Sequence, residues 1–528
     1  MRRAISWLTL PILAFAVLGS ANANGVGKDR TFDSDGIMIG PLEGGLSDVV
    51  VDGDDTVVTG NVLAMRLLPS GAADATFGGG DGIVPNQSDT ITYPGLSPAA
   101  ISLRTGGGYL VATGYPIENY QAPPSWDAAV VALDDAGDLD TGFGGGDGIA
   151  LVSTPNDESV TSMVVDPDGR ILVGATETIG GGDTQFEVVR FSSTGILDAA
   201  FGGGDGVDTY DAGPGNWDHV TDITTTSTGQ PVVVGTSDAI DGSSTMVVAL
   251  LGLDGTPDPS FSGDGYATPH IQDHSAGAGI AVVDGGFVVG AAAWGTPTKP
   301  TQHITDLIDF AIVRLQADGT LDHAFGARHG FTIKSLGGND KAADLTLLSD
   351  GSFLEIGSAD SDYGLLRFTK TGLVDPLFGV VRTDLDQSLD GASAVAVLDD
   401  GRFVVVGSSY AALPCVGGSC YTTYISAVRY KDPGLACTLI GTPTTDNMDG
   451  TPGPDVICVL GGNNVVHALG GADYVYAPSY GKTGDDRFYG GGGPDHLYGG
   501  EGDDLLNGGA GSDTCVGGSG KDTLISCP

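Results

Sequence analysis

The stretches SMVVDPDGRILVGAT (162–176) and FEVVRFSSTGILDAAFGGGDGV (186–207) together contain one complete repeating unit of the first 430 residues. An alternating run precedes Asp168-Gly169, and a run rich in β-branched residues follows that pair. This arrangement predicts a β-hairpin. The run FEVVRF and a closing motif of the form G-x-L-D-x-x-F-G complete the unit. We therefore expect about four short strands in each unit.

The same pattern recurs along the chain, for example in SAVAVLDDGRFVVVGSS (393–409) and in YGLLRFTKTGLVDPLFG (363–379). The spacing of the closing phenylalanines varies from 45 residues (Phe32 to Phe77) to 66 (Phe77 to Phe143). Four strands in a repeat of this length are typical of a β-propeller blade with a long loop. We expect the following phenylalanines to be core residues between blades: Phe32, Phe77, Phe143, Phe201, Phe261, Phe325 and Phe378.

One closing motif is displaced. Asp29-Arg30-Thr31-Phe32 precedes any complete unit, whereas the last unit, ending near Lys431, has no closing motif of its own. Ring closure explains both facts, because the N-terminal strand would complete the last blade and leave no exposed sheet edge. The sequence therefore predicts an all-β, seven-bladed β-propeller. A string of immunoglobulin-like sandwiches would lack the fixed closing motif and its displaced copy.

These units resemble the delta-60 repeat family of bacterial proteins, which are predicted to form β-propellers. The resemblance covers roughly Lys28 to Asp432 and rests on motifs such as RFVVVG (402–407) and GILDAAFG (195–202). It implies an exported repeat protein and offers no general activity.

A second period of nine residues begins after Asp449. The copies are GTPGPDVIC (450–458), VLGGNNVVH (459–467), ALGGADYVY (468–476), GKTGDDRFY (481–489), GGGGPDHLY (490–498), GGEGDDLLN (499–507), GGAGSDTCV (508–516) and GGSGKDTLI (517–525). They follow G-G-x-G-x-D-x-U-x, the calcium-binding nonapeptide of parallel β-rolls. The glycines allow a tight loop that exposes carbonyl groups, and the aspartate at position six adds a hard carboxylate ligand for Ca2+. The apolar residue at position eight is expected to point inward.

The nonapeptides resemble the RTX (hemolysin-type) family, which implies two nonapeptides per turn and ions held between loops one turn apart. The expected metal ligands are Asp455, Asp473, Asp486, Asp495, Asp504, Asp513 and Asp522. The pairs expected to share an ion are Asp486 with Asp504, Asp504 with Asp522, and Asp495 with Asp513.

The copies are unequal. Asn464 replaces the carboxylate of its loop, which predicts weak binding there. Four extra residues, 477–480, are expected to interrupt the stack, which makes Asp455 and Asp473 less secure ligands than the five later aspartates.

The N-terminus has the features of an export signal. Arg2 and Arg3 precede an apolar stretch from Ile5 to Leu18, and Ala21-Asn22-Ala23 fits a cleavage site. The apolar run is shorter than the ~20 residues of a membrane-spanning helix. We expect a signal peptide at 1–23, the propeller at 24–432, a linker at 433–449 and the β-roll at 450–528, with the mature chain secreted or in the cell envelope and without a membrane span.

All six cysteines follow residue 410. An even number in an exported protein predicts disulfides, and proximity in the sequence favours Cys415–Cys420, Cys437–Cys458 and Cys515–Cys527. Six cysteines permit about 15 connectivities, so this pairing rests on sequence proximity alone. A zinc site is the rival interpretation, but the chain has no CxxC pair.

The formal net charge of −45 comes almost entirely from aspartate. Such a surface repels nucleic acid and anionic lipid, so cations are the natural partners. Extracellular polysaccharide or protein is the candidate ligand of the propeller.

No catalytic constellation is evident: the chain contains neither G-x-S-x-G nor H-E-x-x-H. The stretch DDAGDLD (134–140) resembles a calcium loop but aligns with the blade-closing turn. Trp126, Trp217 and Trp294 are expected in loops between strands, where partial burial is favoured over sugar stacking. The predicted function is a calcium-stabilised binding or structural module. The alternative is a hydrolase or lyase that acts on extracellular polymer in the propeller channel, which rests on analogy of fold.

Overall fold

The computed structural model describes residues 27–33, 35–86, 96–117, 125–212, 217–295, 308–375, 378–385, 389–415, 418–431, 439–442, 444–459, 461–477 and 484–527. The expected signal peptide, residues 1–23, lies outside the described residues. Strands dominate the described chain, and its helical elements are two short 3-10 turns, η1 (Gly202–Gly204) and η2 (Gly326–Arg328).

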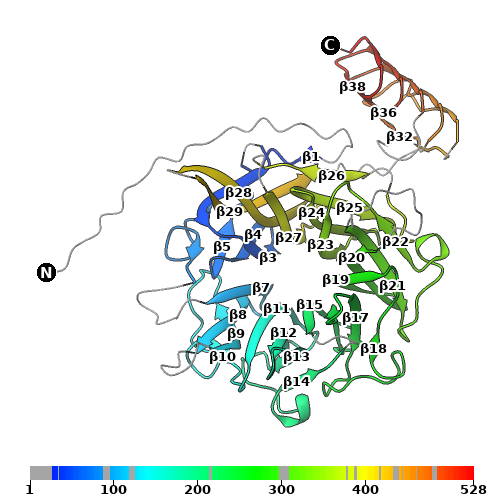
Figure 1. Ribbon diagram of the computed structural model, residues 1–528. Helices are drawn as coiled ribbons and strands as arrows, with labels where there is room; N and C mark the ends of the chain where they lie inside the picture. The colour runs from blue at the N-terminus through cyan, green and yellow to red at the C-terminus, as the bar shows by residue number, and fades with distance from the viewer. Residues whose placement is uncertain are drawn as a thin grey trace.

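Residues 27–431, the propeller region, form sheets arranged in a ring (Figure 1). The strands of the ring follow one another in sets along the chain. The first strand of each set lies closest to the centre of the ring. These inner strands are β3 (Leu46–Asp52), β7 (Ser97–Leu103), β11 (Asp157–Val165), β15 (Trp217–Thr225), β19 (His274–Val283), β23 (Asp340–Leu347) and β27 (Leu389–Val397).

Two further antiparallel strands follow in each set. The second strands are β4 (Asp55–Gly60), β8 (Tyr109–Ile117), β12 (Ile171–Thr178), β16 (Pro231–Asp238), β20 (Gly286–Trp294), β24 (Phe353–Ala359) and β28 (Phe403–Cys415). The third strands are β5 (Ala64–Leu67), β9 (Ser125–Leu133), β13 (Thr184–Phe191), β17 (Ser244–Leu250), β21 (Asp309–Gln316), β25 (Asp362–Phe368) and β29 (Gly418–Lys431). The outer strands are β6 (Ile83–Val84), β10 (Ile149–Leu151), β14 (Val207–Tyr210), β18 (Tyr266–Ala267), β22 (Phe331–Lys334) and β26 (Val380–Thr383).

The described strands of this region are hydrogen-bonded into six sheets, of which one has eight strands. That sheet consists of two antiparallel sets, β11–β14 and β15–β18. A single parallel pair, Thr184 with Trp217, connects the sets.

The hydrophobic cores lie between neighbouring sets of strands. Seven clusters of buried side chains join each set to the next around the ring. The closing phenylalanines belong to these clusters, as the sequence predicts, and at most 2% of each is exposed. The cluster with Phe32 also contains Val49 of β3 and Val404 of β28, so it joins the last set to the first.

An arginine near the end of the third strand holds the closing motif of its own unit. In the unit of β13, the guanidinium of Arg190 donates to Asp198 at 2.9 Å and lies 4.5 Å from the centre of the Phe201 ring. The same combination of an ion pair and a cation–π contact occurs at Arg66 of β5 and Arg367 of β25. Arg104 makes it from another place, directly after the inner strand β7. In these units the closing motif is therefore fixed by charge and by ring stacking.

The last unit makes this contact with the other end of the propeller region. Arg429 of β29 donates to Asp29 at 2.9 Å and to the hydroxyl of Thr31 at 2.9 Å, and it stacks 4.7 Å from the centre of the Phe32 ring. The strands β1 (Gly27–Lys28) and β2 (Ile37–Glu43) both pair with β29. The displaced closing motif thus has the structural place that the sequence predicts for it.

Backbone hydrogen bonds also connect consecutive units. The N–H of the residue after a closing phenylalanine donates to a carbonyl in the closing turn of the next unit, as Gly144 does to Thr194 at 3.0 Å. The glycine of that turn lies against the phenylalanine ring: a Cβ on Gly195, whose φ is +79°, would lie 2.7 Å from Phe143. Both the positive φ and this close approach require glycine.

Residues 439–527, the roll, form two parallel ladders. One contains β30 (Leu439–Ile440), β32 (Val456–Cys458), β34 (Tyr474–Tyr476), β36 (His496–Glu501) and β38 (Thr514–Ser519). The other contains β31 (Asn447–Asp449), β33 (Val465–His467), β35 (Arg487–Gly492), β37 (Leu505–Ala510) and β39 (Thr523–Ile525). Paired residues such as Leu497 and Cys515 are two nonapeptides apart, so two nonapeptides make one turn. Most of the position-eight side chains form the core between the ladders, together with Met448.

Two expectations need correction. The four extra residues do not interrupt the stack, because β34 pairs with β36 and β33 pairs with β35 across them. The expected linker 433–449 also contains roll strands, since β30 and β31 already belong to the two ladders. No helix among the described residues is long and apolar enough to cross a membrane.

The contact between Arg429 and Asp29 predicts a specific stability effect. Asp29→Ala leaves the fully buried Arg429 without its carboxylate, and we expect a loss of ~3–5 kcal/mol in the free energy of unfolding of the propeller region. Asp140→Ala removes the corresponding partner of the more exposed Arg104 and should cost about 1 kcal/mol or less. Urea denaturation of both variants measures the difference. Equal losses would show that ring closure does not depend on this contact.

Candidate metal centre

The aspartates at position six of the nonapeptides lie one above another along the roll. In each case Oδ1 accepts the backbone N–H of the position-six residue one turn earlier. Asp504 accepts from Asp486 at 2.8 Å, Asp513 from Asp495 at 3.0 Å, and Asp522 from Asp504 at 3.1 Å. The structure therefore brings together all three pairs that were expected to share an ion.

The second oxygen of these carboxylates is different. The Oδ2 atoms of Asp473, Asp495, Asp504 and Asp513 are buried and have no hydrogen-bond partner among the described residues. At most 4% of each of these residues is exposed. A buried ionised oxygen without a partner costs free energy, so this row of atoms needs a proton or a cation.

The glycines create the space in which these oxygens converge with backbone carbonyls. A Cβ on Gly490 would lie 2.4 Å from Oδ2 of Asp495 and 2.7 Å from the carbonyl oxygen of Gly508. Gly499 has the same relation to Asp504 and Gly517, at 2.4 and 2.6 Å. Glycine is required because any side chain would fill the space that carboxylate and carbonyl share.

Burial and charge repulsion both act on these carboxylates. Burial is the largest cause that raises the pKa of Asp504 to about 7, and the charges of Asp486 and Asp522 raise it further. Burial likewise raises the pKa of Asp473 and of Asp486 to about 6. A cation between the turns would reverse this preference for the protonated form. Carboxylate and carbonyl oxygens are the ligands that Ca2+ takes, so this set of donors fits calcium.

The N-terminal part of the roll is less regular, as the sequence indicates. The amide nitrogen of Asn464 donates to Oδ1 of Asp486 at 3.1 Å, so this side chain supplies a donor where the other loops supply an oxygen. In Asp455, Oδ2 accepts the N–H of Thr451 at 2.5 Å. Asp473, in contrast, has the same partner-free oxygen as the later aspartates.

One member of the row, Asp446, was not predicted from the sequence. Asp446 precedes the expected roll, yet its N–H donates to Asn464 at 2.9 Å and it continues the stack by one turn. The signal was present in GTPTTDNMD (441–449), which has glycine at position one, aspartate at six and methionine at eight. The missing glycines at positions two and four hid this copy.

A disulfide holds the last turns of the roll. Cys515 is bonded to Cys527, with 5.7 Å between the Cα atoms, as expected from the sequence. The other expected pairings, Cys415–Cys420 and Cys437–Cys458, involve residues or side chains outside those described.

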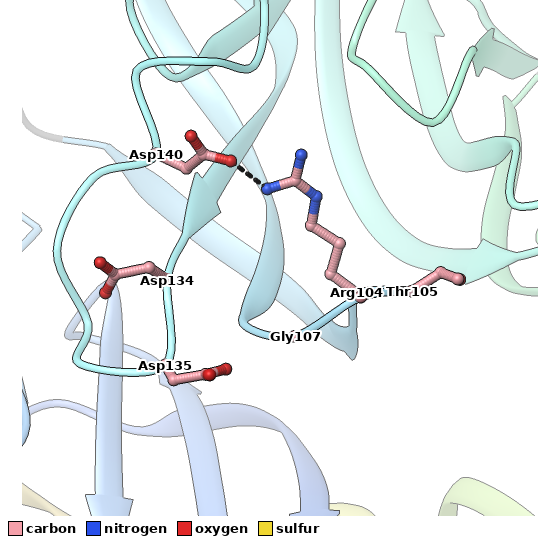
Figure 2. A pocket seen from close by; sticks show the side chains of 7 residues that line it. Arg104, Thr105, Gly107, Asp134, Asp135 and Asp140 are labelled. Atoms are coloured by element: carbon pink, nitrogen blue, oxygen red, sulfur yellow. Dashed lines mark hydrogen bonds and ion pairs between the residues drawn. The ribbon is translucent and has the colours of Figure 1, made fainter.

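The propeller region has a surface pocket of about 340 Å3 at the turn 134–140 (Figure 2). Arg104 points at Asp140 and forms an ion pair with it. Oδ1 of Asp134 accepts the N–H groups of Ala136 and Asp138, both at 2.9 Å. These carboxylates stabilise the closing turn, which agrees with the prediction of a turn for this stretch.

The three tryptophans were placed wrongly by the sequence. Trp126 lies in β9, Trp217 begins β15 and Trp294 ends β20, so all three are in strands rather than loops. All three are partly buried. The indole N–H of Trp217 donates to Gly182 at 3.0 Å, and the ring of Trp294 stacks on His274.

The fold and the candidate site define an all-β protein with propeller-like sheets and a C-terminal β-solenoid. The model of the RTX calcium-binding nonapeptide repeat matches residues 440–475, 480–515 and 489–524. The model described as "Domain of unknown function (DUF5122) beta-propeller" matches residues 167–201, 227–261 and 307–325. The chain thus carries RTX calcium-binding nonapeptide repeats and a DUF5122 β-propeller domain.

A comparison with curated proteins gives no match. Solved structures similar to the chain include a glucose dehydrogenase, with 12% identity, a TM-score of 0.37, and 74% of this chain and 99% of that chain covered. An α-L-arabinanase of Penicillium chrysogenum has 10% identity, a TM-score of 0.38, and coverage of 62% and 92%. Drosophila Plexin A in complex with Semaphorin 1b has 9% identity, a TM-score of 0.38, and coverage of 76% and 88%. Similarities this distant carry no argument about activity.

The raised pKa values predict how the calcium-free roll responds to pH. The folded roll holds protons that the unfolded chain, with an aspartate pKa near 3.8, releases. In chelator, stability should therefore be greatest below about pH 4 and should fall as the pH rises towards 7, the folded pKa of Asp504. Thermal unfolding across this range measures the slope.

Asp504→Asn should reduce that loss of stability, because an amide cannot ionise. Asp503→Asn is the matched control, since Asp503 is the exposed neighbour outside the row. An identical pH dependence in wild type and Asp504→Asn would contradict the assignment.

Proposed function

We propose that the protein is an exported calcium-binding repeat protein that acts as a binding or structural module at the cell surface or outside the cell. Its two parts are a seven-bladed β-propeller and a β-roll stabilised by calcium. Seven inner strands, seven cores between sets and the pairing of β2 with β29 support the blade count. In this interpretation the eight-stranded sheet is two blades.

The proposed boundaries follow the strand pairing. The signal peptide would occupy 1–23, in agreement with the charge and cleavage pattern of the sequence. The propeller would extend to residue 432. The roll would begin at Leu439 rather than at Gly450, because Leu439 pairs with Ile457.

The observation that carries the proposed calcium function is the row of buried Oδ2 atoms without partners. We assign the metal to Asp486, Asp495, Asp504, Asp513 and Asp522, with weaker contributions from Asp473 and Asp455. Each ion would lie between carboxylates one turn apart and would replace the protons that these groups otherwise hold. Calcium binding would then be coupled to folding of the roll.

The inner strands support a structural rather than a catalytic role for the acidic residues nearest the centre. Asp222, at the β-bulge of β15, accepts the N–H of Ile223 at 2.7 Å and that of Ile280, in the neighbouring set, at 3.0 Å. Asp48 and Asp344 make the same pair of bonds with their own and the next set. These carboxylates fasten neighbouring inner strands to each other. Extracellular polysaccharide or protein is the proposed class of ligand for the outer surface of the propeller.

Thermal unfolding of the mature chain with millimolar calcium and with chelator tests the calcium function. We expect calcium to raise the free energy of unfolding of the roll by about 2.7 kcal/mol at a hundredfold excess over Kd. Asp504→Ala combined with Asp513→Ala should abolish most of that rise, because adjacent ions lose their carboxylates.

Asp503→Ala is the control, because it removes an exposed acid of the same loop and should leave the rise intact. If calcium shifts no transition of the wild-type chain, the nonapeptides are empty turns and the proposed function is wrong.

A further inference from the structure

Three glutamates lie on one face of the set β11–β14. Glu158 of β11 is paired directly with Glu177 of β12, and Glu187 of β13 is paired with Ala175, two residues before Glu177. One carboxylate oxygen from each residue lies within 4.8 Å of the other two. The exposed fractions are 3% for Glu158, 7% for Glu177 and 0% for Glu187. The core residues Val173 and Ala175 share this face, which packs against the set β7–β10.

Three of the six carboxylate oxygens in this cluster have no donor among the described residues. Both oxygens of Glu187 and one of Glu158 are buried without a hydrogen-bond partner among the described residues. Asn156 donates to Glu177 at 2.7 Å, and Thr154 donates to the other oxygen of Glu158. In the described chain, none of the three glutamates forms an ion pair with a basic side chain. The fully buried Glu187 therefore faces two other carboxylates, and no basic side chain among the described residues neutralises it.

A fourth carboxylate comes from the neighbouring set. Asp127 of β9 is 2% exposed, and its Oδ2 is also buried without a partner. Burial raises the pKa of Glu187 to about 9, and the charges of Glu158, Glu177 and Asp127 add to that rise. The group of mutually close carboxylates is thus the three glutamates, and the charge of Asp127 acts on Glu187 from the neighbouring set.

Five of the other six sets have no such charge. The residue equivalent to Glu187 is the third-strand partner of the second-strand residue that pairs just before the bulge of the inner strand. In these five sets it is Ala129, Val247, Ala311, Gly364 or Ser426. Neighbouring blades therefore pack together with small or apolar residues at this position. Glu187 instead places a buried carboxyl group at this position. Packing does not require such a group, which indicates that Glu187 has another role.

We propose that Glu158, Glu177 and Glu187 form a calcium site on the face that packs against the neighbouring blade, separate from the roll. The donors are all hard oxygens, as calcium requires. Oxygens on opposite sides of a Ca2+ ion lie about 4.6–5.2 Å apart, so a cluster within 4.8 Å has a suitable size. Mg2+ binds at about 2.0–2.1 Å and demands a smaller octahedron, so calcium is the better fit.

A second acidic cluster, Asp362 with Asp384 and Asp390, does not support the same inference. Arg382 forms an ion pair with Asp362 at 3.0 Å, so a cation of the protein already neutralises that group. Of these two clusters, the glutamate cluster is the one without a basic partner among the described residues.

The test is the number of calcium ions bound to the mature full-length chain, measured by equilibrium dialysis at saturation. Glu187→Gln with Glu177→Gln should lower the count by one ion per chain relative to wild type. Glu355→Gln is the matched control: Glu355 is also fully buried, but it accepts the N–H of Ala291 at 3.0 Å and belongs to no cluster. Its variant should bind as many ions as wild type.

Glu187→Val provides a second measurement, because valine occupies the equivalent position in the next set, at Val247. In chelator this variant should unfold at the same temperature as wild type or higher, since a buried carboxyl group without hydrogen-bond partners is removed. With calcium, the propeller transition of wild type should rise while that of Glu187→Val stays unchanged. The roll transition should respond to calcium equally in both proteins.

An unchanged ion count in the double glutamine variant overturns the proposal. So does a propeller transition of wild type that ignores calcium, or a site that is filled by Mg2+ alone. None of these results affects the roll, whose own sites are removed independently by Asp504→Ala with Asp513→Ala.

Discussion

The propeller region depends on one repeated contact, in which an arginine at the end of the third strand binds an aspartate and stacks on the closing phenylalanine. Within a unit the partners are eight residues apart, as in Arg190 with Asp198. At the join they are 400 residues apart, in Arg429 with Asp29, and the geometry is the same. The same local contact therefore completes individual units and also closes the ring. Closure pairs the edge of the last sheet and removes a site for aggregation.

The roll differs from the propeller region in how its carboxylates are neutralised. In the propeller region, guanidinium groups of the chain neutralise aspartates of the closing motif. In the roll, Oδ2 of four stacked aspartates has no partner among the described residues: Asp473, Asp495, Asp504 and Asp513. Their neutralisation must come from outside, as protons or as calcium. The two parts of the chain therefore differ in what they need in order to fold, although both are repeats of short strands and glycine turns.

Much of the fold and of the candidate metal site could be predicted from the sequence, because each copy of a repeat carries the same local pattern and forms the same local structure. The phenylalanines, the position-six aspartates and the displaced motif around Asp29 are fixed by local pattern. Asp446 was missed since its nonapeptide lacks two of the glycines. The glutamate cluster was invisible for another reason: Glu158, Glu177 and Glu187 come together only through strand pairing and sheet packing. The tryptophans were misplaced because long loops between units obscure where strands begin.

Hydrogen exchange of the mature chain, with and without calcium, tests the central claim most directly, because it reports on individual amides. The N–H groups of Asp486, Asp495 and Asp504 donate to the carboxylates one turn further along the roll. The account predicts that calcium protects these amides strongly, while the amides of Gly78 and Gly144, which connect propeller units, are protected in both conditions. Roll amides that exchange at the same rate with calcium and with chelator would contradict it.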